Sequence, residues 1–327
     1  MPNVREGLVV IKTYTFDQYG LKKAADFQGK LANLVWIDLD TPSNEEKALI
    51  ERAYGIEIPT RDEIQEIESS VRFRQVNSAI YATLTVISRN APDAPKNIDV
   101  TFILVSDTMI TLRYGEVEPF RRFSSEAALQ AGMCSSAEVL YVGLLEGIVE
   151  YVSDILVTIG AERDAISNAI FRNEKPQGNA FHDILRRIGL MGDMASKVYE
   201  SLLSSSRLFV FLTQTRAFQD ESNKTRLRVL ASDVLPLNDH AVYLSNKVNF
   251  MLDATLGMIN IEQNNIIKLF TVAATGLMPP TLIASIYGMN FKIIPELQWE
   301  YGYFYALMLM VCSSILPFWY FKRKGWL

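Results

Sequence analysis

Two long stretches without a charged side chain lie near the C-terminus, and they constrain the fold more than any other feature of this 327-residue chain. No Asp, Glu, Lys or Arg occurs in residues 269–291 or in residues 301–321. A helix needs roughly 18–20 apolar residues to cross a hydrocarbon core about 30 Å thick, and each stretch is long enough. One such stretch could be a buried helix of a soluble domain, but two in succession predict a pair of transmembrane helices.

The side chains that flank the two stretches predict their orientation. Lys268 precedes the first stretch, and a Lys-Arg-Lys run at residues 322–324 follows the second. Because Lys and Arg are enriched on the cytoplasmic side of membrane helices, we expect both chain termini in the cytoplasm. Only residues 291–300 should be exposed outside. Aromatic belts are expected at the far interface and at the near one: Trp299, Tyr301, Tyr303, and Trp319, Tyr320, Phe321.

The N-terminus, the cysteines and the charge predict an acidic cytoplasmic body. The first ten residues, MPNVREGLVV, have no basic segment leading into a long apolar one, so we expect no signal peptide. Cys134 and Cys312 are isolated and make no disulfide framework. Residues 1–267 hold 27 basic and 35 acidic side chains, a net charge of −8, whereas residues 268–327 carry a net charge of +3. Such a body does not suit nucleic acid or anionic lipid as a partner and does suit cations.

Residues 1–236 are predicted to form a cytoplasmic α/β domain. The runs LVVIK, NLVWIDL and AIYATLTVI read as strands, and DVTFILVSDTMITLRY reads as a hairpin around Ser106 and Asp107. Residues 41–55 predict a helix with Thr41 as its N-cap, Pro42 at the first helical position and Gly55 beyond its end.

Long helices are predicted from Ser135 onward. Ser135 and Glu138 have the spacing of a capping box, and two helices over about 135–217 predict an antiparallel pair. A third helix is predicted to begin near Leu237, after a break at SDVLPLND, and to continue to about residue 290. Its roughly 50 residues would span about 75–80 Å.

The predicted division of the C-terminal part follows from these helices. The stalk and first transmembrane pore helix take residues 237–290, with residues 269–288 in the membrane, and Pro279 and Pro280 should kink this helix. An external loop takes residues 291–300, a second transmembrane helix residues 301–321, and a basic cytoplasmic tail residues 322–327.

Ten residues recur along the third helix at alternating spacings of four and three. This 3.5-residue period is typical of a seam between supercoiled helices, but the residues are small, polar or flexible rather than Leu and Ile. One hypothesis is a helix–helix contact made of small residues. The other is a pore wall, which Asn260 and Asn264 favour because unpaired amides in an apolar seam are costly. The ten residues are Asp253, Gly257, Asn260, Asn264, Ile267, Thr271, Ala274, Met278, Thr281 and Ser285.

The residue types argue against an enzyme. His182 and His240 are the only histidines, so the HExxH and two-Cys, two-His zinc patterns are absent. We expect both histidines on polar helical surfaces. The run GLMGDMASK lacks the spacing of a phosphate-binding loop.

The junction between the two apolar stretches carries a family resemblance. The sequence reads YGMNF, then PEL, Trp and YGY, and the chain ends in FKRKGWL. Together with INIEQNNIIKLFTVAATGLMPPTLIAS upstream, this strongly resembles the CorA family of magnesium channels, and within it the enterobacterial-type members. These motifs cover about the last 80 residues. Residues 1–230 agree with the family only in their architecture.

The resemblance implies a funnel-shaped homopentamer in the cell inner membrane, with an α+β cytoplasmic domain, a very long stalk and pore helix, and two C-terminal transmembrane helices. It implies a selectivity filter at Gly288, Met289 and Asn290, which would hydrogen-bond the waters of hydrated Mg²⁺. Ile294 departs from the Met that usually precedes Pro-Glu-Leu in this family. The resemblance also implies pore-lining positions at Asn264 and at the gate residues Ile267 and Met278, with Asp253 near the cytoplasmic mouth. The 3.5-residue repeat adds Thr271 and Thr281 to the predicted pore lining, and Glu296 is expected in the outer loop.

The family further implies that intracellular Mg²⁺ binds between subunits and closes the pore. The motifs do not identify the carboxylates that bind it; Asp93, Asp99, Asp220 and Asp233 are candidates. Two alternatives stay open at this point: a related transporter of Co²⁺, Ni²⁺ or Zn²⁺, and a membrane-anchored cytoplasmic sensor that transports nothing.

Overall fold

The computed structural model describes residues 11–17, 20–23, 34–65, 72–88, 95–128, 136–171, 179–215, 218, 220–290, 292 and 294–326. The chain divides into two compact units, Met1–Leu252 and Asp253–Leu327. The boundary predicted at residue 236 therefore falls inside the first unit.

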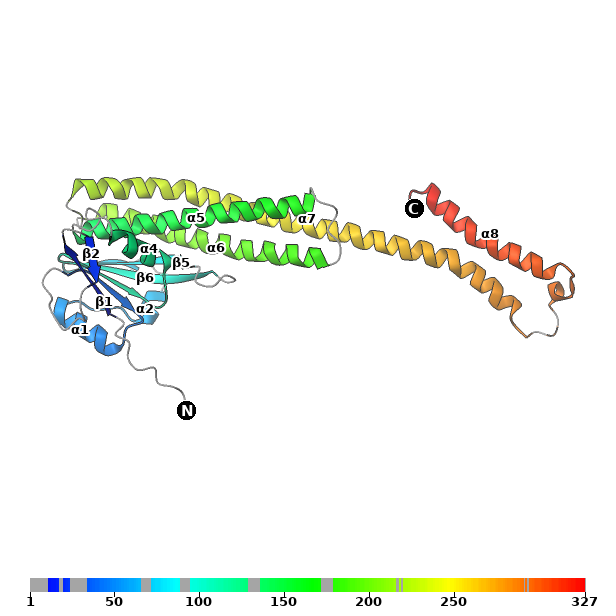
Figure 1. Cartoon of the computed structure of the whole chain (residues 1–327), viewed down its shortest axis with the longest axis horizontal. Helices are drawn as coiled ribbons and strands as arrows, with labels where there is room; N and C mark the ends of the chain where they lie inside the picture. The colour runs from blue at the N-terminus through cyan, green and yellow to red at the C-terminus, as the bar shows by residue number, and fades with distance from the viewer. Residues whose placement is uncertain are drawn as a thin grey trace, which may run out of the picture. The chain divides into compact units, whose positions relative to one another are not determined.

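A seven-stranded sheet forms the centre of the first unit (Figure 1), in the order β2-β1-β3-β7-β6-β5-β4. Neighbouring strands are antiparallel except β3 and β7, which are parallel. The predicted hairpin around Ser106 and Asp107 is confirmed as β6 and β7. The strands are β1 (Ile11–Asp17), β2 (Gly20–Lys23), β3 (Leu34–Asp40), β4 (Phe73–Val76), β5 (Ala79–Ser88), β6 (Lys96–Val105) and β7 (Thr108–Arg113).

Helices cover both faces of the sheet. On one face, α1 (Asn44–Tyr54) and α2 (Arg61–Gln65) bury Ile50 and Ile64 against Ile37 of β3. On the other face, α4 (Glu118–Ala127) and α5 (Ala137–Phe171) pack Phe120 and Tyr141 against aromatic side chains of the sheet. Because successive residues of a strand point to opposite faces, a strand buried on both faces reads as a continuous apolar run. Residues 34–37 of β3, LVWI, are such a run, which the buried Asp38 ends.

The predicted N-cap of α1 is wrong in detail, and the one predicted for α5 falls outside the described residues. The N-cap of α1 is Ser43, not Thr41, and Ser43 and Glu46 form a reciprocal capping box, with hydrogen bonds of 3.2 and 2.7 Å. Pro42 therefore precedes the helix. At the start of α5, the Ser136 hydroxyl accepts a hydrogen bond from the Val139 backbone N–H at 3.2 Å. Ser135 lies outside the described residues. In both cases the serine that caps is the one whose Oγ reaches the N–H three residues on.

The predicted antiparallel pair corresponds to α5 and α6 (Asn179–Gln214), which pack against each other. The third helix, α7 (Glu221–Tyr287), begins 16 residues earlier than the predicted Leu237. Pro236 does not end it, although a proline inside a helix costs about 3 kcal/mol. Buried apolar side chains continue at helical spacing on both sides of Pro236 and offset that cost: Leu227, Leu230, Val234, Ala241, Leu244 and Val248.

The second unit consists of the C-terminal part of α7, a 3-10 turn η2 (Pro295–Gln298) and α8 (Gly302–Arg323). Both helices are long and apolar enough to cross a membrane. Their large apolar side chains face outward, with Phe270 70% and Phe304 68% exposed. A surface of this kind is typical of contact with lipid or with other chains, which agrees with the two predicted membrane helices.

Candidate functional site

The ten residues of the predicted pore face, hereafter the α7 stripe, lie on one side of α7. All ten, from Asp253 to Ser285, are exposed in the single chain. The predicted gate residues Ile267 and Met278 are 60% and 70% exposed. The structure therefore leaves this side of α7 open within the single chain.

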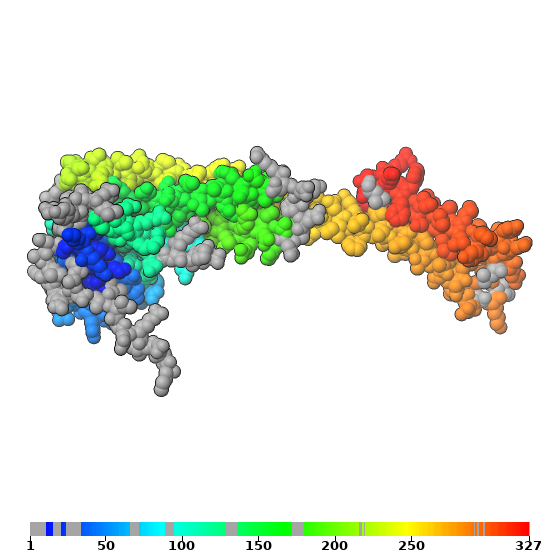
Figure 2. All heavy atoms as spheres, viewed as in Figure 1, coloured from blue at the N-terminus to red at the C-terminus, as the bar shows by residue number. Residues whose placement is uncertain are grey.

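The second helix of this unit covers a different face of α7. Val272 and Gly276 are buried there, and Phe318 of α8 lies directly over Gly276. Figure 2 shows the two helical surfaces in contact. At ~100° per residue, the α7 stripe lies about 150° around the helix from the face that α8 covers. A contact between α7 and α8 consequently does not explain the stripe.

The two threonines of the stripe donate their hydroxyl protons to backbone carbonyls of α7. Thr271 Oγ1 donates to the Ile267 carbonyl, and Thr281 Oγ1 donates to the Leu277 carbonyl, both at 2.7 Å. A threonine hydroxyl has one proton and two lone pairs. Each hydroxyl therefore presents only acceptor lone pairs outward, which suits the protons of water bound to a cation.

The predicted filter residues follow the last turn of α7. The Gly288 N–H donates to the Ala284 carbonyl at 3.0 Å, and the Met289 N–H to the Ile286 carbonyl at 3.2 Å. Gly288 is not in the left-handed region; instead, a Cβ there would lie 3.1 Å from the Ala284 carbonyl oxygen. Met289 and Asn290 are exposed. Glycine at residue 288 thus avoids a close contact between a Cβ atom and the Ala284 carbonyl oxygen.

A compact turn follows the filter residues and leads into α8. Pro295 starts the 3-10 turn, and Gly302 lies so close to the Glu296 carbonyl that any side chain would clash with it. The rings of Trp299 and Tyr305 are 5.7 Å apart. These contacts explain why the PEL, Trp and YGY motifs occur together, and they hold Glu296 in a partly exposed position.

One chain does not bring the predicted site residues into a cavity. Along α7, Asp253 and Ser285 are separated by 32 residues, or roughly 48 Å. Asp253, Asn264 and Asn290 all point into the surroundings of the chain. Within one chain, these three side chains therefore make no common site.

The candidate regulatory carboxylates have different surroundings. Asp99 forms an ion pair with Arg72 at 2.6 Å and accepts a hydrogen bond from Thr85. Asp220 accepts from the Ser222 backbone N–H at 3.1 Å, as a residue at a helix start does. Asp233 is exposed, and Asp93 lies outside the described residues. Within the described part of the chain, no group of three or more His, Cys, Asp or Glu side chains could hold a metal ion.

Both histidines lie on helix surfaces, as predicted. His182 on α6 and His240 on α7 are exposed, and His240 stacks on Tyr243 with ring centroids 6.0 Å apart. Cys312 is exposed on α8, and Cys134 lies outside the described residues.

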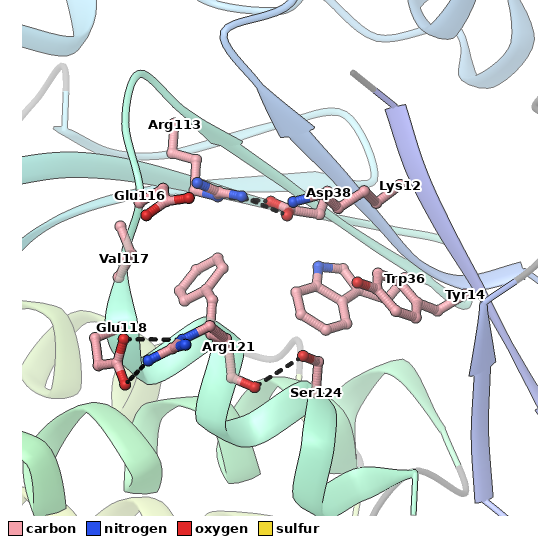
Figure 3. Close-up of a pocket in the computed structure, with 11 residues that line it drawn as sticks. Lys12, Tyr14, Trp36, Asp38, Arg113, Glu116, Val117, Glu118, Arg121 and Ser124 are labelled. Atoms are coloured by element: carbon pink, nitrogen blue, oxygen red, sulfur yellow. Dashed lines mark hydrogen bonds and ion pairs between the residues drawn. The ribbon is translucent and has the colours of Figure 1, made fainter. Parts of the chain in front are cut away.

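A cavity of about 120 Å³ lies between the sheet and α4 (Figure 3). Its charged wall is a buried network that the sequence analysis missed: Arg113 donates to both oxygens of Asp38, at 3.0 and 2.9 Å, and Thr111 donates to Asp38 at 2.9 Å. Burial lowers the pKa of Arg113, but Asp38 and Asp40 outweigh that effect and raise it overall. Burial and the charge of Asp38 raise the pKa of Tyr14 to about 12. The charges of Asp38, Asp40 and Arg113 therefore satisfy one another inside the first unit.

Comparisons with known proteins agree with this architecture. The family profile described as "CorA-like Mg2+ transporter protein" matches residues 32–323. The Magnesium transport protein CorA of Sodalis glossinidius is 34% identical over 303 residues, which cover 93% of this chain and 95% of the relative. That of Escherichia coli K12 is 34% identical over 297 residues, covering 91% and 93%.

A solved structure shares the fold of the whole chain. The complete structure of the CorA magnesium transporter from Methanocaldococcus jannaschii superposes with a TM-score of 0.76 at 18% identity. The superposition covers 98% of this chain and 99% of that one.

Proposed function

This chain belongs to the CorA-like Mg²⁺ transporter family, and we propose that it conducts Mg²⁺ into the cell through a pore lined by the α7 stripe. The observation that carries the proposal is that all ten stripe residues are exposed, on a face that α8 does not cover. A symmetric ring of chains would turn these faces toward a common axis and leave α8 outside, against lipid. We take the number of chains as five, as the family resemblance implies.

The chemistry of the stripe suits a cation that keeps its water. Mg²⁺ is small, prefers octahedral oxygen coordination and gives up water reluctantly. The protons of its bound waters point outward and require acceptors. Thr271 and Thr281 offer acceptors only, and Asn264 and Asn290 offer amide oxygens. The proposed pore can therefore pass the hydrated ion without stripping it.

The filter is proposed at Gly288, Met289 and Asn290. Rings of Asn290 amides and Gly288 carbonyls would hydrogen-bond the waters of one ion. Ile267 and Met278 would provide apolar constrictions that gate by losing water. Asp253 would form a ring of carboxylates roughly 24 Å before the first membrane residue, and Glu296 would lie near the outer entrance.

Regulation is proposed to use intracellular Mg²⁺ bound between subunits. Residues 1–267 carry a net charge of −8, which would give roughly −40 in a pentamer. Divalent cations that bridge carboxylates of two subunits would relieve this repulsion locally. Among the candidates, Asp233 is exposed, whereas Asp99 is already paired with Arg72.

Ion flux into liposomes tests the transport proposal. Purified protein is reconstituted with a fluorescent indicator inside, and Mg²⁺, Co²⁺, Ni²⁺ and Zn²⁺ are supplied separately. We expect Mg²⁺ entry at millimolar concentration, with Co²⁺ also able to enter. Zn²⁺ is a poor candidate because it prefers Cys and His ligands, and neither type occurs in the α7 stripe or in the filter. Entry of no cation would instead support a membrane-anchored sensor.

Limited proteolysis tests the regulatory proposal separately. Cleavage of the cytoplasmic domain should be faster in chelator and slow again at millimolar Mg²⁺. High NaCl should protect poorly, because screening acts over about 8–10 Å but supplies no bridge between ligands. Equal cleavage with and without Mg²⁺, or equal protection by NaCl, would contradict the sensor and leave the pore untouched.

A further inference from the structure

The C-terminal end of α8 is closed by a specific backbone turn. Gly325 has φ +71°, its N–H donates to the Lys322 carbonyl at 3.2 Å, and the Trp326 N–H donates to the Phe321 carbonyl at 3.0 Å. These two bonds define a Schellman motif. The motif folds Trp326 back onto Phe321, with ring centroids 5.2 Å apart and an interplanar angle of 22°.

Two of the three cations in this last turn lie over aromatic rings of the preceding turn. The guanidinium carbon of Arg323 is 5.7 Å from the ring centroid of Trp319, and the Lys324 ammonium is 5.4 Å from that of Tyr320. Their charged groups therefore stay at the depth of the aromatic belt instead of reaching away from the helix end. In membrane proteins that depth is the level of the lipid headgroups.

This group of seven residues, hereafter the basic-aromatic cap, is exposed and strongly cationic. Trp319, Tyr320 and Trp326 are 58%, 51% and 40% exposed. Among the described residues, no carboxylate forms an ion pair with its three cations. The sequence contains no Asp or Glu after Glu300. The cap consists of Trp319, Tyr320, Phe321, Lys322, Arg323, Lys324 and Trp326.

A fourth cation lies at a similar level on α7. The two helices meet where Phe318 covers Gly276. Lys268 is eight residues before Gly276, or roughly 12 Å along α7, and residues 322–324 are roughly 6–9 Å beyond Phe318 along α8. Because the helices run antiparallel (Figure 1), both displacements point the same way. Lys268 thus adds to the positive charge at this end of the unit.

We propose that the basic-aromatic cap is a binding site for the headgroup of an anionic phospholipid. Lys322, Arg323 and Lys324 would bind the phosphodiester, with the planar guanidinium of Arg323 donating two hydrogen bonds. The exposed rings would pack against the glycerol and the first acyl carbons. The acidic body carries the opposite charge and takes no part. The proposal goes beyond ion transport and holds for either orientation of the membrane helices.

Native mass spectrometry of the full-length oligomer tests the proposal. The protein is titrated in detergent with phosphatidylglycerol or phosphatidylcholine of matched acyl chains. Each Lys or Arg near a lipid surface contributes about 1 kcal/mol, so we expect phosphatidylglycerol to bind at least roughly tenfold more tightly. The triple variant Lys322→Gln, Arg323→Gln, Lys324→Gln should bind both lipids equally. Lys292→Gln, at the opposite end of the unit, is the matched control and should keep the preference.

Two other outcomes of this titration would overturn the lipid-binding proposal. An unchanged preference in the triple variant overturns the proposal, and so does displacement of bound lipid by millimolar inorganic phosphate, which would mark a site for soluble anions. If the triple variant fails to assemble, Arg323→Gln and Trp326→Ala carry the same comparison, because both side chains are exposed. The readout is bound lipid mass, so a protein that binds lipid but moves no Mg²⁺ would overturn only the proposed transport function.

Discussion

The two units of this chain differ in where their polar side chains lie and in what those side chains pair with. In the first unit, two pairs of buried polar groups meet within the chain: Asp38 with Arg113, and Thr83 with Thr101 at 2.9 Å. In the second unit, Asn264 and Asn290 are exposed. A buried polar group without a partner is costly. These groups of the first unit have partners within the chain, whereas the exposed amides of the second unit have none of their hydrogen-bonding capacity committed to a buried contact.

The apolar side chains follow the same division. Ile37, Leu39 and Ile103 are fully buried in the first unit. The second unit differs. Among its described apolar side chains, only Val272 and Ala306 are buried. Substitutions in the first unit should thus change the stability of a single chain, and substitutions on the α7 stripe should change what an assembly conducts.

The largest expected effect is the loss of Mg²⁺ uptake in Asn290→Ala. Asn290 is the only side chain of the proposed filter that both donates and accepts hydrogen bonds. Five lost bonds of about 1 kcal/mol each exceed the ~3 kcal/mol that a 100-fold loss requires. Uptake into liposomes is measured alongside the oligomer mass, and Gln298→Ala, an exposed loop neighbour, is the control. Near-normal flux from an assembled variant would contradict the filter assignment.

Asp38→Ala should destabilise the first unit by about 3–5 kcal/mol, because it leaves the Arg113 guanidinium buried without its main partner. Hydrogen exchange of the β3 and β7 amides measures the loss of protection in the full-length protein. Asp239→Ala, at an exposed position on α7, should have little effect. The ion selectivity of any remaining transport should be unchanged. Altered selectivity would contradict the assignment of stability to the first unit and of conduction to the α7 stripe.

Gly276→Ala should weaken the contact between α7 and α8 by about 1–3 kcal/mol. A Cβ at residue 276 would lie 2.5 Å from the Phe318 ring, so the helices or the ring must move. The midpoint of thermal unfolding of the oligomer reports the change. Gly189→Ala on α6 is the matched control, since nothing lies within 4 Å of a Cβ there and the residue is outside the α7 stripe. Adding Phe318→Leu should restore part of the lost stability; no recovery would argue against this contact as the cause.

The smallest expected effect is that of Asp253→Ala. We expect a change in flux of less than about tenfold, with the preference for Mg²⁺ over Na⁺ retained, because an exposed carboxylate roughly 24 Å from the membrane acts by weak, screened attraction. Flux of both ions is compared in low and high salt. A lost preference for Mg²⁺ would move selectivity away from residues 288–290.

Local patterns predicted most of the elements, and packing decided the rest. The 3.5-residue spacing of small and polar residues predicted the exposed α7 stripe. The length of the two uncharged stretches predicted the membrane helices. Pro236 suggested a helix boundary that buried neighbours override. Asp38 and Arg113 are 75 residues apart and meet only because β3 and β7 pair in parallel. No local pattern identifies such a pair, nor the contact of Gly276 with Phe318.

The back-bonded threonines of the α7 stripe have a consequence for the sign of the charge that a pore would admit. An anion such as chloride is solvated by proton donors, and the protons of Thr271 and Thr281 are already committed to the carbonyls of Ile267 and Leu277. These hydroxyls can accept hydrogen bonds from the waters of a hydrated cation, but they have no free proton to donate to an anion. The part of the stripe from Thr271 to Ser285 carries no formal charge, yet its threonine hydroxyls would still favour a hydrated cation over an anion.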